Sequence, residues 1–229
     1  PVNDAFAADS ECPVCAMFEQ LENDAIEYTM GPSYMEDDIR AVTDKKGFCQ
    51  KHIKKIYEQN NRLGYALVMK THMDYVIKTI ESYNQDRGTG KSLLKKGKES
   101  SVCSYIEELD SSCFVCDKIA DTIERYVDTI FYMYKHDNEF KKPLSGCKGF
   151  CTNHYGLLMK KASEKLGGGD YTEFTELITS LYLDNMKRVR DDVEWFINKF
   201  DHKYADAPWK NAKDSLVRAT LKDTGCKLS

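Results

Sequence analysis

Apolar residues recur at helical spacing through most of this 229-residue chain. One such face runs from Ala16 to Met30, and the Gly31-Pro32 pair that follows predicts the end of that helix. A shorter helix is predicted from Tyr34 to Val42. After Cys49 a long apolar pattern extends from Ile53 to Ile80, in which Gly64 can bend or interrupt the helix. The first half of the chain is therefore predicted to be helical.

The second half follows the same plan. A loop is expected before Gly149, and the Gly167-Gly168-Gly169 run is a helix breaker without the Gly-Lys-Ser/Thr ending of a phosphate loop. No alternating apolar and polar run and no Asn-Gly hairpin indicates a β-strand. The fold class predicted is therefore all-α. The helices expected here run from about Cys116 to Tyr134, Phe150 to Leu166, Tyr171 to Phe200 and Asn211 to Lys222.

A charged, glycine-containing stretch at 86–102 interrupts the helical pattern. We interpret it as a flexible basic linker between a first helical repeat, 1–85, and a second repeat with a C-terminal helix, 103–229. Both halves carry more apolar positions than one helix face needs, so we expect the two repeats to pack as one body. The predicted architecture is a helical bundle of two pseudo-repeats.

Composition and charge narrow the class of protein. Hydrophobic residues make up 41% of the chain and charged residues 31%, which is enough apolar material for a core and argues against wholesale disorder. A formal net charge of −4 makes the chain a poor candidate for wrapping nucleic acid. No apolar run approaches the length of a membrane span, and the start of the chain does not have the pattern of a signal peptide.

The nine cysteines carry the clearest chemistry. An odd number in a long chain without an export signal favours metal ligands or reduced thiols over a disulfide scaffold. One pattern occurs twice: a CxxC pair, followed after some 35 residues by GFCxxH. In CxxC two thiolates can reach one ion, and in CxxH the ligands share one helix face. The eight positions are Cys12, Cys15, Cys49, His52, Cys113, Cys116, Cys151 and His154.

Each motif pair predicts one closed site with three thiolates and one imidazole, the ligand set of structural zinc. Neighbouring motifs are expected to combine, which gives one site from the first CxxC and the first GFCxxH, and a second site from the second pair. Each site would then staple its own pseudo-repeat. An iron–sulfur cluster is the alternative cofactor, because thiolates suit both metals and the spacing does not separate them.

The other candidate residues give weaker signals. Cys147 is a candidate accessory ligand, although a loop thiol is the simpler interpretation, and Cys103 and Cys226 are interpreted as buried or free thiols. No catalytic motif of the common hydrolase, nucleotide-binding or metalloprotease types is present. A polar pocket between the repeats could be built from Glu36, Asp37, Arg40, His72 and His202, each of which is also typical of an ordinary helix surface.

Several strings of this chain occur together: PVNDAF at 1–6, CPVC at 12–15, YMEDDIR at 34–40, both GFCxxH motifs, NRLG at 61–64, and WF at 195–196 with KFD at 199–201. Together they resemble an uncharacterised bacterial family, found largely in Gram-positive anaerobes and named only as a domain of unknown function. The resemblance covers essentially the whole chain. It implies a cytoplasmic protein with a duplicated Cys/His unit and a few residues preceding Pro1, and it implies no activity.

These observations predict a cytoplasmic zinc-binding protein, more an interaction or regulatory module than an enzyme, with an unknown protein or small-molecule partner. Two other functions stay open: an enzyme that uses the polar pocket between the repeats, and an iron–sulfur or thiol redox protein.

Overall fold

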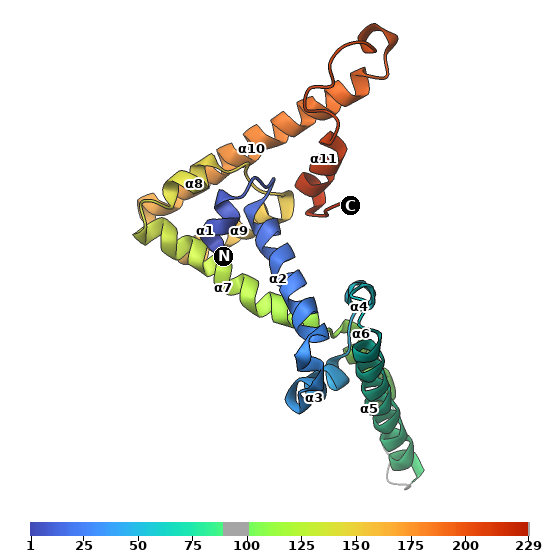
Figure 1. The fold of residues 1–229 in the computed structure, drawn as a ribbon. Helices are drawn as coiled ribbons and strands as arrows, with labels where there is room; N and C mark the ends of the chain where they lie inside the picture. The colour runs from blue at the N-terminus through green and yellow to red at the C-terminus, as the bar shows by residue number, and fades with distance from the viewer. Residues whose placement is uncertain (89–100, 229) are drawn as a thin grey trace. The chain divides into compact units, whose positions relative to one another are not determined.

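A computed structural model describes residues 1–88 and 101–228 (Figure 1). These residues contain no β-strand, which confirms the all-α prediction. None of the helices in this part of the chain is both long and apolar enough to cross a membrane. The helices are α1 Val2–Ala7, α2 Pro13–Met30, the 3-10 turn η1 Pro32–Met35, α3 Asp37–Lys46, α4 Gln50–Glu58, α5 Arg62–Gly88, α6 Ser101–Ser111, α7 Phe114–His136, α8 Lys141–Gly146, α9 Thr152–Lys165, α10 Gly168–Asn198, η2 His202–Tyr204 and α11 Ser215–Thr224.

The chain forms two compact units that do not follow the boundaries expected from the sequence. Unit 1 comprises Pro1–Glu19 and Ile123–Ser229, and unit 2 comprises Gln20–Thr122. Helices α2 and α7 therefore each contribute residues to both units. Most of the predicted linker, 89–100, lies outside the described residues, and its two ends belong to α5 and α6.

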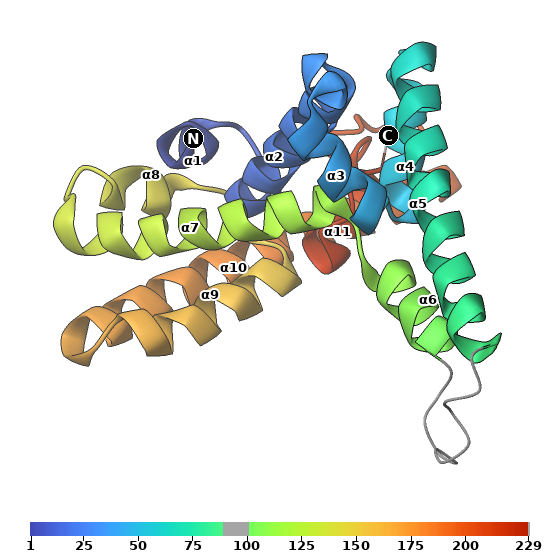
Figure 2. The ribbon, with the colours of Figure 1, turned by 90° about the horizontal axis from the view of Figure 1, so that it is seen from below.

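Unit 1 is built around an aromatic core. Phe6 packs edge-on against Phe140 with ring centroids 5.1 Å apart, and Phe174 packs against Tyr134 at 4.9 Å. Such edge-to-face pairs add to the stabilisation from burial alone. Helices α9 and α10 lie side by side in this unit (Figure 2), and α11 packs against both. This core includes Cys12 and Cys151, so the metal-ligand candidates of unit 1 lie within packed structure.

Unit 2 has a smaller core in which α3, α4 and α6 pack against α5. Its fully buried side chains include Ile56 from α4, Val68 from α5 and Val115 from the start of α7. The break between α4 and α5 lies at Asn60, which has a left-handed φ of 60°, and not at Gly64. Asn61 explains the shift, because its side chain accepts a 2.9 Å hydrogen bond from the Gly64 N–H and so caps α5.

Candidate metal centres

Four ligand atoms of unit 1 converge on one point. The first cluster consists of Cys12, Cys15, Cys151 and His154, whose ligand atoms all lie within 4.8 Å of one another. The His154 Nδ1 atom lies 3.5, 3.3 and 3.2 Å from the sulfurs of Cys12, Cys15 and Cys151 respectively. The Cys15 and Cys151 sulfurs are 3.6 Å apart. One metal ion could be held by all four residues.

Unit 2 holds the matching second cluster, which consists of Cys49, His52, Cys113 and Cys116. The His52 Nδ1 atom lies 3.3 Å from each of the three sulfurs, and the Cys49 and Cys116 sulfurs are 3.9 Å apart. The two clusters thus have the same ligand types, and in each of them the Nδ1 atom of the histidine faces the sulfurs.

The combination of motifs differs from the one expected from the sequence. Each CxxC pair lies beside the GFCxxH motif of the other half, so that Cys15 meets Cys151 and Cys116 meets Cys49. The pairing of neighbouring motifs was therefore wrong. The physical reason is that the start of α2 packs its apolar side chains into the core of unit 1, whereas the first GFCxxH motif belongs to unit 2.

Each cluster forms where the beginnings of two helices meet. Cys49 and Cys151 are the N-cap residues of α4 and α9, and each histidine lies three residues later in the first turn. The preceding glycines, Gly47 and Gly149, have positive φ angles of 60° and 75°. This geometry favours glycine and turns each chain into its helix. Helix N-termini carry partial positive charge, which favours thiolates at these positions.

The side chains of the first cluster shift one another's pKa values through their hydrogen bonds. Hydrogen bonds with Cys12 and with Cys151 raise the pKa of Cys15, whereas hydrogen bonds from Cys12 and Cys15 lower the pKa of Cys151. Burial opposes protonation of His154, but its hydrogen bonds with Cys12 and Cys151 raise its pKa to about 9. Three thiols this close cannot all ionise alone, and a divalent cation at their centre would displace the protons.

The second cluster has a carboxylate behind its histidine. The Glu22 Oε1 atom accepts a 2.9 Å hydrogen bond from His52 Nε2, and the Glu22 side chain is only 4% exposed. Burial disfavours the Glu22 carboxylate, but hydrogen bonds from Lys51, Lys55 and His52 lower its pKa to about 2. A carboxylate in this place fixes the ring orientation and leaves Nδ1 as the ligand atom.

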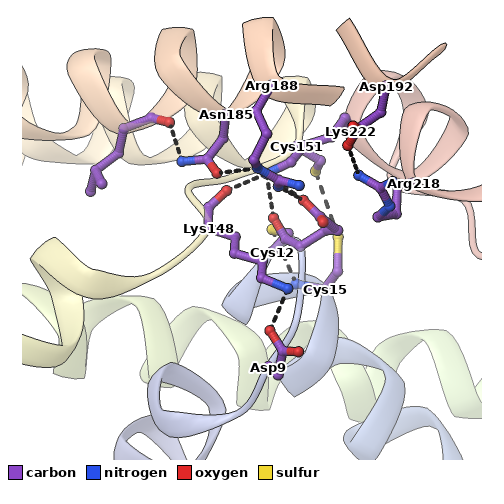
Figure 3. A network of polar contacts seen from close by, with 12 residues as sticks. Asp9, Cys12, Cys15, Lys148, Cys151, Asn185, Arg188, Asp192, Arg218 and Lys222 are labelled. Carbon is purple, nitrogen blue, oxygen red and sulfur yellow. Dashed lines mark hydrogen bonds and ion pairs between the residues drawn. The ribbon is translucent and has the colours of Figure 1, made fainter. Parts of the chain in front are cut away.

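The first cluster has a different surrounding, shown in Figure 3. The Lys222 side chain is 1% exposed, and its ammonium donates to the main-chain oxygens of Glu11 and Lys148. Arg188 forms an ion pair with the Glu11 carboxylate at 2.5 Å. Both cations pair with Glu11, the residue before Cys12, and Lys222 also interacts electrostatically with Cys12.

A comparison with protein families matches a stretch of the chain that includes both clusters. Residues 1–228 match DUF6062, a family of unknown function. The chain belongs to DUF6062. No curated protein and no solved structure matches it. The expected membership of an uncharacterised domain-of-unknown-function family is confirmed, whereas a bacterial, Gram-positive origin stays a prediction.

The remaining cysteines of the DUF6062 chain are outside both clusters. Cys147 is half-buried at the C-terminal end of α8 and packs against the core of unit 1, where burial raises the pKa of its thiol. It is not among the four converging ligands of the first cluster, which favours the interpretation as a loop thiol. Cys103 and Cys226 are both exposed.

The polar residues considered for a pocket belong to two different units, His202 to unit 1 and the other four to unit 2. Glu36 and Asp37 are exposed at the start of α3, with the half-buried Arg40 one turn later. His72 belongs to α5 and contacts α3 near the C-terminal end of that helix. Its Nδ1 atom forms a 2.7 Å hydrogen bond with the Asp44 carbonyl, so His72 supports the turn at Gly47. His202 is exposed in η2 of unit 1.

Three residues that contribute to the DUF6062 clusters were not predicted from the sequence: Glu22, Lys222 and Gly225. Glu22 lies seven residues after the second cysteine of its CxxC, and Ile123 has the same place after the other CxxC. Within the described residues no carboxylate is hydrogen-bonded to His154, in line with that difference. A buried acidic position on an otherwise apolar helix face was the available signal for Glu22. Lys222 and Gly225 gave no such signal.

Proposed function

We propose that this chain is a zinc protein in which one structural Cys3His site stabilises each of the two helical units. The observation that carries the proposal is the convergence of four ligand atoms on one point in each cluster. Three thiolates and one imidazole complete a tetrahedron and leave no position for water, as is typical of structural sites. Zinc in such sites supplies folding free energy, on the order of 10–16 kcal/mol in small peptides.

The distances between ligand atoms support a single tetrahedral ion. Zinc bonds of about 2.3 Å to sulfur and 2.0–2.1 Å to nitrogen put two sulfurs about 3.8 Å apart and sulfur and nitrogen about 3.5 Å apart. The sulfur–sulfur distances of 3.6 and 3.9 Å and the sulfur–nitrogen distances of 3.2–3.5 Å are close to these values.

The same convergence argues against an iron–sulfur cluster. In such a cluster the protein ligands are distributed over two or more iron atoms, so they surround a body of several atoms. Ligand atoms that all lie within 4.8 Å of one another fit one ion better than such a body. Zinc is therefore the cofactor that we propose for both sites.

We further propose that the chain acts in the cytoplasm as an interaction or regulatory module, with a protein or small molecule as its partner. Closed metal sites favour a structural over a catalytic role. The net charge of −4 argues against nucleic acid as the partner. None of the polar residues considered for an enzyme pocket lines either of the two hollows described for this structure, so they give no support to the catalytic alternative.

The test is elemental analysis combined with an absorption spectrum of the full chain, purified anaerobically and without chelators. We expect two zinc ions per chain and a colourless protein. A folded chain without metal would contradict the proposal, and so would iron with visible absorption. The spectrum separates these two outcomes, because zinc sites do not absorb visible light.

A further inference from the structure

The two clusters have the same ligands but different cover. In the first cluster Cys12 and Cys151 are almost fully buried, at 1% and 0% exposure, and Cys15 is half-buried. In the second cluster Cys116 is exposed and Cys49 is half-buried. One chain therefore contains a protected and an accessible version of the same site.

The C-terminal segment provides the cover of the first cluster. Gly225, directly after α11, lies so close that a Cβ atom there would be 3.5 Å from the Cys151 sulfur and 3.7 Å from the Cys15 sulfur. Thr152 and Asn153, next to Cys151, donate hydrogen bonds of 3.1 and 3.0 Å to main-chain oxygens of α11. These bonds fix the segment over the sulfurs.

The second cluster opens onto a surface hollow instead. Cys49 lines this hollow, whose volume is about 480 Å³, together with Phe48 and with Ile106 and Leu109 from α6. A small molecule in the hollow would contact Cys49, and the sulfur of the exposed Cys116 lies only 3.9 Å from the Cys49 sulfur. Two accessible thiolates are therefore adjacent.

We propose that Cys116 is an oxidation site for reagents of the peroxide class, and that Cys49 is its resolving partner. The inference rests on zinc occupying the second cluster as proposed above. Susceptibility of a cysteine to oxidation follows its thiolate character and its exposure. Metal ligation keeps the thiolate form in both clusters, so exposure decides which cluster reacts.

The proposed step proceeds in two parts. The Cys116 thiolate attacks one oxygen of the peroxide, the O–O bond breaks, and a sulfenic acid and a hydroxide ion form. The Cys49 thiolate then attacks the Cys116 sulfur, the S–O bond breaks, a second hydroxide leaves, and the disulfide forms. The two thiolates lose two electrons and the peroxide gains them. Cys113 and His52 then remain as ligands, which are too few for a closed site.

The test uses the zinc-loaded full chain with Cys103→Ser and Cys226→Ser, which remove the exposed thiols outside the clusters. Hydrogen peroxide is added with a chromogenic zinc chelator, and disulfides are mapped by mass spectrometry after alkylation. We expect one zinc per chain to be released roughly tenfold faster than the other, because exposure controls oxidation. The first disulfide should join Cys49 and Cys116.

A second variant tests the role of cover. A chain that ends at Thr224 loses Gly225 but keeps all eight ligands. We expect oxidation of the first cluster to accelerate in this variant, so that the two release rates approach each other. An unchanged rate at the first cluster would refute the role assigned to the C-terminal segment.

Three further results would overturn the inference. These are equal release rates of both zinc ions from the full-length variant, a first disulfide within the first cluster, or a first disulfide between Cys113 and Cys116. Zinc content is measured before peroxide is added. A chain without zinc at that stage refutes the proposed function as well, whereas two zinc ions with equal release rates refute only the oxidation site.

Discussion

Replacing Glu22 by alanine should weaken metal binding at the second cluster and leave the first cluster unchanged. The Glu22 carboxylate is buried and accepts hydrogen bonds from His52 Nε2 at 2.9 Å, from Lys51 at 2.7 Å and from Lys55 at 2.5 Å. The alanine variant removes all three contacts without changing a ligand. It therefore isolates the effect of the residue behind the histidine.

The expected magnitude follows from the His52 contact. His52 is 2% exposed, so its Nε2–H group cannot turn to water when the carboxylate is lost. An unsatisfied buried donor destabilises a protein by about 1–3 kcal/mol. Loss of an outer-shell partner lowers metal affinity by about 10–100-fold, which is about 1.4–2.7 kcal/mol and agrees with that range. Lys51 and Lys55 are partly exposed, so both regain water and their ion pairs add little.

The assay is competition for zinc with a chelator of graded concentration, followed by alkylation and mass spectrometry. Cysteines that have lost their metal become alkylated, so the peptides report which cluster has emptied. Glu22→Gln keeps an acceptor oxygen for His52 and should retain most of the affinity. Glu27→Ala, an exposed position on the same helix, is the matched control and should leave both clusters unchanged.

Two results would refute this reasoning. One is a loss of affinity in the Glu22→Ala variant smaller than about threefold, because that falls well below the range for an outer-shell partner. The other is an equal loss at both clusters, which would mean that the substitution acts through general unfolding rather than through His52.

The motif combination and the glycine turns give two further predictions. Cys12→Ser and Cys151→Ser should each abolish the same zinc site, so the double variant should lose no more zinc than either single variant, whereas Cys49→Ser should abolish the other site. Zinc counting combined with cysteine alkylation measures this. A zinc site shared by Cys12 and Cys49 would contradict the structure. Gly149→Ala should lower thermal stability, because a positive φ costs about 1–2 kcal/mol and the added Cβ would lie 2.7 Å from a main-chain oxygen of α10. Gly146→Ala, where a Cβ meets nothing within 4 Å, is the control in the same melting experiment, and equal melting temperatures would refute the clash.

The local structure of the clusters follows from sequence because it depends on short-range geometry. The i, i+3 spacing of Cys49 and His52 requires one face of a helix, and Gly47 supplies the positive φ of the turn before it. The same argument gave the start of α9. The helix break was misplaced at Gly64, because capping by Asn61 decides where α5 begins.

The residues around the clusters could not be predicted in this way. Glu22 is separated from His52 by 30 residues, and the contact exists only because α2 and α4 meet in unit 2. Gly225 approaches the sulfurs of residues far from it in the chain. Such contacts depend on tertiary packing, so the pairing of Glu22 with His52 and the approach of Gly225 to the sulfurs do not follow from motif spacing.

The prediction of which motifs combine failed for a different physical reason. Loop-closure entropy favours neighbouring motifs, but only weakly. The first cluster joins Cys15 to Cys151, a separation of 136 residues, and the second joins His52 to Cys113, a separation of 61. Combining neighbouring motifs would close loops of about 35 residues instead. The extra entropy of the longer loops is only about 1–2 kcal/mol in total, since loop closure grows with the logarithm of length.

Core packing easily exceeds this difference. Val14 and Met17 follow Cys12 on α2 and are 0% and 3% exposed in unit 1, and Val115 and Ile119 follow Cys113 on α7 and are 0% and 2% exposed in unit 2. Burial of one such side chain contributes about 1.5–3 kcal/mol. The apolar residues that follow each CxxC therefore decide which unit that motif joins. Cys/His spacing identifies the ligands of a duplicated site, whereas the adjacent core residues determine which ligands share an ion.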